Sequence, residues 1–160
     1  GRSVVVKKVT KTSDMKRTDA FYTEIKIMKE LDHPNICRLL EVYEVRSHIF
    51  FVMEYCEGKE VFDRIVETGG VSEAVTADIV GQVTAALRYA HGRLIAHRDI
   101  KPENVVFCTG DKSDTRVKLI DWGLSICFDG AVMRTAVGSK TYAAPEVMAS
   151  RNMTAYTEAC

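Results

Sequence analysis

The sequence predicts an α+β fold, in which a small sheet with one helix comes first and a helix-rich part follows. Three observations predict it. A β-branched run, "SVVVKKV", opens the chain at residues 3–9, and two further strand-like runs cover residues 38–45 and 48–55. From residue 72 onward the apolar residues recur at helical spacing over about five turns.

The first helix is predicted over residues 19–31, where apolar side chains such as Ile25 and Met28 recur at helical spacing. Asp19 is its predicted N-cap. Glu24 lies four residues before Met28 and therefore on nearly the same face of the helix. We expect its carboxylate to lean toward whatever the helix packs against.

The next elements are an antiparallel strand pair and a long helix. A short polar turn separates residues 38–45 from residues 48–55, which favours a hairpin. Ser72 is the predicted N-cap of the long helix, and Gly92 the predicted end. The character of the chain changes near residues 55–60, between the sheet-rich and the helix-rich part.

Composition excludes several classes of protein. Lys and Arg number 22 and Asp and Glu number 22, so no overall field favours nucleic acid or an anionic membrane as a partner. The longest apolar run, Ile49 to Met53, is far too short to span a bilayer, and we expect a cytoplasmic or nuclear protein. The cysteines are odd in number and form no CxxC pair, so they indicate neither a disulfide framework nor a zinc site. They are Cys37, Cys56, Cys108, Cys127 and Cys160.

A charged stretch, "AHRDIKPENVVF" at residues 96–107, follows the long helix and precedes a short apolar run. Asp99 can accept a proton, Lys101 can neutralise a developing negative charge, and the amide oxygen of Asn104 suits a hard cation. Seventeen residues further, "LIDWGLS" supplies a second carboxylate, Asp121. Together these residue types predict a magnesium and phosphate site.

The charged loop, the "DWG" triplet, the "VVVK" strand, Glu24 in its helix and "AAPE" at residues 143–146 resemble, in order, the catalytic domain of eukaryotic protein kinases. Lys101 and "GSKTYAAPE" resemble serine/threonine kinases. "HIFFVMEYCEG", "FDRIV" and "HRDIKPENVVF" are most similar to the calcium-dependent and calmodulin-dependent kinases.

The resemblance implies the two-lobe kinase fold in truncated form. Residues 1–54 would be a partial N-lobe, from the third strand to the start of the hinge, and residues 55–160 a partial C-lobe, ending just past the "APE" motif. We therefore expect a fragment, which alone would be marginally stable, bind ATP weakly and show little activity.

The resemblance also implies ATP and Mg²⁺ as cofactors, with a role for each charged residue. Lys7 would hold the α- and β-phosphates and pair with Glu24. Asp99 would be the catalytic base and Lys101 a contact of the γ-phosphate. Asn104 and Asp121 would be the magnesium ligands.

Around the nucleotide, the resemblance makes Met53 the gatekeeper, and Glu54 to Cys56 the hinge that meets adenine. Val5 and Val106 would be the ceiling and floor of the adenine slot, and Val5 departs from the usual alanine of the family. A hydrophobic column would join the two lobes, and its members would be Met28, Leu40, His97 and Trp122. Trp122 stands where phenylalanine is commoner in the family.

Protein substrates are implied as partners, with the target Ser or Thr near basic residues. The resemblance assigns Glu60 to both the nucleotide site and the substrate site. Glu60 and Glu103 would meet an arginine upstream of the target residue. Lys59 beside Glu60 would weaken that preference. Arg98 would pair with a phosphate on Thr135. A calcium-binding regulatory region would have to lie outside this chain, because no EF-hand loop occurs in it.

Simpler interpretations stand beside each role. Lys7 and Glu24 alone would most often be a solvated surface pair, Asp99 a turn residue and Asn104 a cap. Cys56 is most simply a partly buried thiol. At the level of function, the alternative to an active kinase is a noncatalytic pseudokinase or truncated scaffold that binds partners through the same fold.

Overall fold

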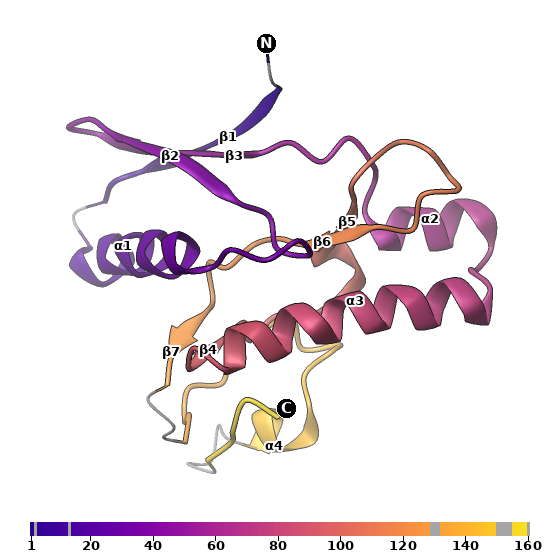
Figure 1. Ribbon diagram of the computed structural model, residues 1–160. Coiled ribbons are helices and arrows are strands. Elements are labelled where there is room, and N and C mark those ends of the chain that lie inside the picture. The colour runs from indigo at the N-terminus through magenta and orange to yellow at the C-terminus, as the bar shows by residue number, and fades with distance from the viewer. Residues whose placement is uncertain (2, 13, 129–131, 150–154, 160) are drawn as a thin grey trace.

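The computed structural model describes residues 1, 3–12, 14–128, 132–149 and 155–159, with only the backbone at residues 15–17. A three-stranded sheet and helix α1 occupy one end of the molecule, and the other helices, the small strand pairs and the C-terminal segment occupy the other end (Figure 1). No helix in the described ranges is both long and apolar enough to cross a bilayer.

The sheet contains β1 (Val4–Thr10), β2 (Leu39–Glu44) and β3 (His48–Glu54), in the order β1-β3-β2, and all neighbours are antiparallel. This confirms the predicted hairpin. Lys7 stands opposite Phe51 in the central strand. Lys7 and Val9 are the half-buried positions of β1, as the two-residue period of a strand requires, so the Lys7 side chain faces inward.

Helix α1 (Met15–Glu30) lies against the sheet (Figure 1) and begins four residues earlier than the sequence predicts. The predicted N-cap, Asp19, is wrong: it lies inside the helix, where its carbonyl accepts the Thr23 hydroxyl at 3.0 Å. Helical bonding already starts at Asp14, whose carbonyl accepts the Thr18 N–H at 3.2 Å. Apolar spacing marks only the part of a helix that packs against the protein, and after Met15 the first turn here is polar, with Lys16, Arg17 and Thr18.

Two helices follow the sheet, α2 (Val61–Thr68) and α3 (Glu73–His91). Ser72 is the N-cap of α3, as predicted, and its hydroxyl accepts the Val75 N–H at 3.3 Å. Gly92 ends the helix while its own backbone stays right-handed, and the left-handed residue is Leu94, at φ 59°.

Short elements hold the loops that carry charge. β4 (Ile95–Ala96) pairs with β7 (Ile126–Cys127), and β5 (Val105–Phe107) pairs with β6 (Val117–Leu119). The turn η1 (Pro102–Asn104) leads into β5, and α4 (Pro145–Ala149) follows later. The charged stretch therefore lies between two strand pairs, which fix both of its ends.

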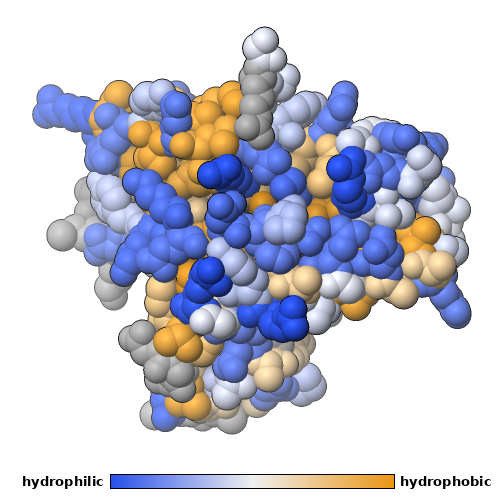
Figure 2. Space-filling model, viewed as in Figure 1, coloured by the Kyte–Doolittle hydropathy of each residue, from blue (hydrophilic) through white to orange (hydrophobic). Residues whose placement is uncertain are grey.

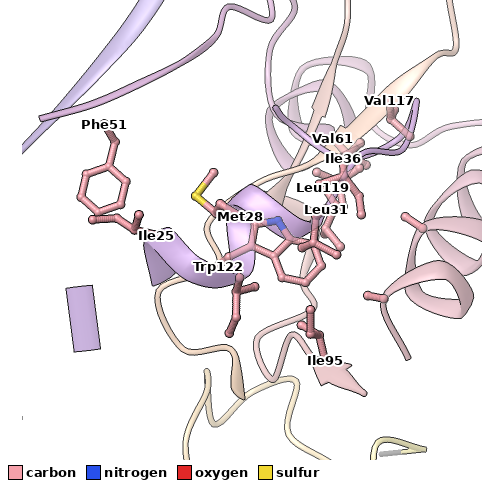
Figure 3. Packing of buried hydrophobic residues seen from close by; sticks show 14 of the residues in the cluster. Ile25, Met28, Leu31, Ile36, Phe51, Val61, Ile95, Val117, Leu119 and Trp122 are labelled. Carbon is pink, nitrogen blue, oxygen red and sulfur yellow. The ribbon is translucent and has the colours of Figure 1, made fainter. Parts of the chain in front are cut away.

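The main hydrophobic core joins the two ends of the molecule. It combines side chains from α1 and β3 with others from α3 and the small strand pairs, and Trp122 lies among them with no exposed surface (Figure 3). The Trp122 ring meets the His97 ring edge-on, with the centroids 4.6 Å apart. Apolar side chains remain exposed on β1, at Val4 and Val6, and Figure 2 shows apolar surface over the sheet.

The predicted hydrophobic column needs one correction. Met28, His97 and Trp122 are buried, as expected. The β2 residue that packs on the core cluster is Leu39, whereas Leu40, predicted for that place, is half-buried at an irregularity in the β2–β3 pairing. A bulge shifts the alternation of side chains by one residue, which the sequence pattern does not reveal.

Trp122 supports a prediction about stability. Its indole Nε1 is buried without a hydrogen-bond partner in the described residues. Trp122→Ala should lower the free energy of unfolding by about 3–5 kcal/mol, measured by urea denaturation, because it leaves a large cavity. Trp122→Phe should cost less, because it keeps an aromatic ring and removes an unpaired donor. Equal losses in the two variants would contradict this account.

Candidate active site

A cavity of about 350 Å³ opens between the sheet and the segments around β5 and β6. Its size lies within the range of roughly 300–1,000 Å³ that small-molecule sites occupy. Apolar side chains form most of its wall, and charged groups gather at one place. The lining residues are Val5, Lys7, Glu24, Met28, Cys37, Met53, Glu54, Cys56, Val106, Ile120, Asp121 and Trp122.

Lys7 and Glu24 form the ion pair at the charged part of this cavity. The Lys7 Nζ lies 2.8 Å from the Glu24 Oε1 and 3.6 Å from the Asp121 Oδ1. Glu24 is only 4% exposed, and a buried carboxylate requires a partner. The pair is therefore no solvated surface contact: the ammonium is held between two carboxylates at the cavity wall.

Asp121 has a left-handed backbone, at φ 57°, which non-glycine residues adopt rarely and often at functional sites. Its side chain is 53% exposed, so its oxygens are open to a ligand. A Cβ on Gly123 would lie 3.2 Å from the Asp121 Oδ1 and 3.5 Å from the Glu24 Oε2. The third residue of "DWG" thus leaves room for both carboxylates.

Asp99 is surrounded by donors from the charged loop and from a distant segment. Its Oδ1 accepts the Ser139 N–H at 2.8 Å, and its Oδ2 lies 2.9 Å from the Lys101 Nζ. Asn104 Nδ2 donates to the same Oδ2 at 3.0 Å and to the Asp99 carbonyl at 2.8 Å. The carboxylate is therefore fixed in orientation.

Two opposing effects determine the pKa of Asp99. Burial opposes ionisation, but hydrogen bonds from Lys101 and Ser139 outweigh it and hold the pKa of Asp99 below its ordinary value. The hydrogen bond to Asp99 likewise raises the pKa of Lys101. At neutral pH the two groups are a carboxylate and an ammonium.

Asn104 and Asp121 offer the oxygen atoms that Mg²⁺ prefers. Because the Asn104 amide nitrogen donates to Asp99, its amide oxygen is the atom left to accept or ligate. The Ile120 N–H donates to the Asn104 carbonyl at 2.9 Å, which ties the loop to the residue before Asp121. Within the described residues, no three His, Cys, Asp or Glu side chains converge as a metal cage. The pair fits a magnesium ion that takes its other ligands from phosphate and water.

His97 connects the two charged loops. The Asp99 N–H donates to its Nδ1 at 3.2 Å, and its Nε2–H donates to the Ile120 carbonyl at 3.0 Å. Burial lowers the pKa of His97, which keeps the ring neutral. This ring therefore sets the spacing between Asp99 and Asp121 through two backbone contacts.

Sequence reasoning missed Ser139 and Gly138 as site residues. Besides its N–H contact to Asp99, Ser139 accepts a hydrogen bond from the Lys101 Nζ at 2.8 Å. Gly138 has φ 97°, and a Cβ there would lie 2.4 Å from the Arg98 carbonyl. "GSKTYAAPE" is recognisable as a motif in the sequence. No local pattern, however, predicts that its Ser139 contacts Asp99, which lies 40 residues earlier in the chain.

Besides Asp99, Lys101 and Asn104, four further predicted residues lie outside the lining of the cavity: Glu60, Arg98, Glu103 and Thr135. The Arg98 Nε donates to the Leu124 carbonyl at 2.7 Å, and Thr135 is exposed. Glu60 lies just before α2, where its backbone pairs with Val106, and it is not among the residues that line the cavity. A carboxylate oxygen of Glu103 is buried without a partner in the described residues.

Comparison with known proteins agrees with this geometry. The protein kinase domain model matches residues 1–159, and the chain belongs to the protein kinase family. It is 39% identical over 150 residues to the calcium/calmodulin-dependent protein kinase type 1 of Macrobrachium nipponense, covering 94% of this chain and 43% of that protein. It is 41% identical over 145 residues to the calcium-dependent protein kinase 5 of Plasmodium berghei (strain Anka), covering 88% of this chain and 26% of that protein.

A third relative, the calcium/calmodulin-dependent protein kinase type 1 of Caenorhabditis briggsae, is 36% identical over 148 residues, which cover 92% of this chain and 41% of that protein. The chain thus spans less than half the length of these relatives. Their names agree with the subgroup that the sequence predicts. Protein kinases in general use ATP and Mg²⁺.

The surroundings of Asp99 yield a prediction about its titration. Lys101→Met should raise the pKa of Asp99, because burial remains while the main stabilising charge is lost. In the wild type the lowered pKa contributes stability above the unfolded value of about 3.9, and that contribution disappears as the pH falls through the folded pKa. Carboxyl ¹³C NMR titration measures both. An unchanged pKa in Lys101→Met would contradict this assignment.

Proposed function

We propose that the full-length protein containing this chain transfers the γ-phosphoryl group of ATP to Ser or Thr hydroxyls of protein substrates, with Mg²⁺. One observation carries the proposal. The Lys7, Glu24 and Asp121 cluster at the cavity wall is joined, through Asn104 and Ile120, to the Asp99 network. These are the charged groups that phosphoryl transfer requires, and they come from β1, α1 and two adjacent loops.

In this proposal the cavity holds the nucleotide. Val5, Met53 and Val106 contact the adenine, and the backbone from Glu54 to Cys56 meets its edge. The Lys7 ammonium contacts the α- and β-phosphates while Glu24 holds it in place. Asn104 and Asp121 hold the magnesium ion, which when bound neutralises charge on the phosphates.

Asp99 and Lys101 act on the transferred group. Asp99 accepts a hydrogen bond from the substrate hydroxyl and orients it, and Lys101 contacts the γ-phosphate. A carboxylate with a lowered pKa is a weak base, which suits phosphoryl transfer because its loose transition state asks for positioning more than for early proton removal. The Ser139 contacts to both side chains keep them at a fixed separation.

Basic peptides are the proposed substrates. Glu60 precedes α2, and Glu103 lies in η1, an element that contacts α2. Lys59, which the sequence sets beside Glu60, forms an ion pair with Glu67 instead. The charge of Lys59 is therefore paired with Glu67 and would not repel an arginine at the proposed site.

Regulation is proposed at two levels. The relatives' names mention calcium or calmodulin, so a calcium-responsive region elsewhere in the full-length protein is the first level. The second is a phosphate on Thr135, which is exposed, pairing with Arg98. Within the described residues, the Arg98 guanidinium donates to the Leu124 carbonyl through its Nε. We propose the cytoplasm, with the nucleus as a second location, as the site of action.

A noncatalytic scaffold is the competing function. It would need no intact charge network, and the described residues of this chain retain every charged group that the proposed reaction uses. The active-kinase proposal is therefore favoured over the scaffold.

A phosphate-transfer assay on the full-length protein tests the proposal, with radiolabelled ATP and a basic serine peptide, with and without calcium. Asp121→Asn and Lys7→Met should each lower kcat/KM by at least about 10²–10³-fold, since each removes charge stabilisation at the phosphates. Lys8→Met is the matched control, because Lys8 neighbours Lys7 but is exposed on the opposite face of β1, and it should leave the rate unchanged. No transfer by the wild type under any condition would favour the scaffold.

The same assay tests substrate choice with a second peptide that lacks the upstream arginines. Glu60→Gln should raise KM about 10-fold for the arginine peptide, a loss of roughly 1.4 kcal/mol, and leave the second peptide unaffected. Glu73→Gln, an exposed carboxylate at the start of α3, is the control. Equal effects of Glu60→Gln on both peptides would remove it from the substrate site.

A further inference from the structure

Two thiols meet at the nucleotide cavity, and neither has a role in the proposed reaction. Cys37 and Cys56 both line the cavity, and both are free. The Cys37 Sγ lies 3.5 Å from the Glu54 carbonyl, to which it donates, and Glu54 is two residues before Cys56. The chain thus brings together cysteines 19 positions apart.

The backbone holds both cysteines in place. The Cys37 N–H donates to the Leu119 carbonyl at 3.0 Å, and the Glu54 N–H donates to the Arg38 carbonyl at 2.9 Å. These contacts fix the segment after α1 against the segment after β3. Cys37 and Cys56 therefore lie on two neighbouring segments that backbone hydrogen bonds hold together, and both line the same cavity.

The pair is chemically unequal. The contact with the Cys37 thiol lowers the pKa of Cys56, although burial opposes this. The same contact and burial raise the pKa of Cys37. The charged groups around them are Glu54, which disfavours a thiolate, and Lys118, which favours one.

We propose that Cys37 and Cys56 form an oxidisable thiol pair in the wall of the cavity, which a peroxide converts into a disulfide. The Cys56 thiolate attacks one oxygen of hydrogen peroxide and the O–O bond breaks. The hydroxide that leaves takes a proton to become water, and Cys56 becomes a sulfenic acid. The Cys37 sulfur then attacks the Cys56 sulfur, the S–O bond breaks and a second water leaves with the Cys37 proton. Two electrons pass from the thiols to the peroxide.

The other cysteines of the described residues differ in their settings. Burial raises the pKa of Cys108, which disfavours its thiolate. Cys127 is exposed on β7, away from the cavity lining. These two thiols are the natural controls for the pair.

The effect on nucleotide binding rests on the proposed function. A disulfide would replace the thiol that now donates to the Glu54 carbonyl and would tether the hinge to the segment before β2. The wall of the cavity around the adenine could then no longer adjust its shape to the nucleotide. We expect ATP affinity to fall at least about 10-fold on oxidation and to return with dithiothreitol.

Peptide mapping of the full-length protein tests the pair directly. After brief hydrogen peroxide treatment, alkylation of free thiols and trypsin digestion, the peptide of residues 30–38 should be found linked to the peptide of residues 47–59, lighter by two hydrogens. Cys37→Ser and Cys56→Ser should each abolish the link, and Cys108→Ser and Cys127→Ser should keep it. Absence of this link, or a link from Cys56 to the Cys108 peptide, would overturn the proposal.

Binding of a fluorescent ATP analogue to the reduced and oxidised protein separates the two claims. If the link forms but the reduced protein binds no nucleotide, the thiol pair stands and the kinase proposal fails. If reduced and oxidised protein bind equally well, the control of binding by this pair is overturned.

Discussion

The buried carboxylate of Glu24 is the constraint on which the site depends. At 4% exposure this carboxylate requires a partner, and the partner is Lys7, 2.8 Å away on the neighbouring strand. This requirement fixes α1 against the sheet and fixes the Lys7 ammonium at the cavity wall. Asp121, 3.6 Å from the same ammonium, completes a cluster to which helix, sheet and loop each contribute one residue.

A second set of contacts links this cluster to Asp99. His97 and Asn104 both reach the backbone of Ile120, and both contact Asp99. Asp99 therefore shifts only if the strand leading to Asp121 shifts as well. Such rigid coupling is what positioning requires, since phosphoryl transfer depends more on placed charges than on covalent chemistry by the protein.

The sequence predicted what depends on local spacing or on a recognised motif. Glu24 points inward because it lies four residues before Met28, and Ser72 caps α3 because a hydroxyl there reaches Val75. Contacts between distant segments were not predictable: Ser139 lies 40 residues from Asp99, and a bulge brings Leu39 rather than Leu40 to the core. The start of α1 was misplaced because its first turn is mostly polar. The lobe boundary at residue 54 and the individual catalytic roles stay predictions.

ATP affinity of Glu24→Gln, measured by calorimetry on the full-length protein, tests most directly whether the Glu24 carboxylate positions Lys7 for the phosphates. The substitution keeps the volume and removes the charge, so affinity should fall at least about 10-fold, or roughly 1.4 kcal/mol. Glu30→Gln, at the exposed end of the same helix, should bind like the wild type. Equal affinity in Glu24→Gln and the wild type would contradict the account.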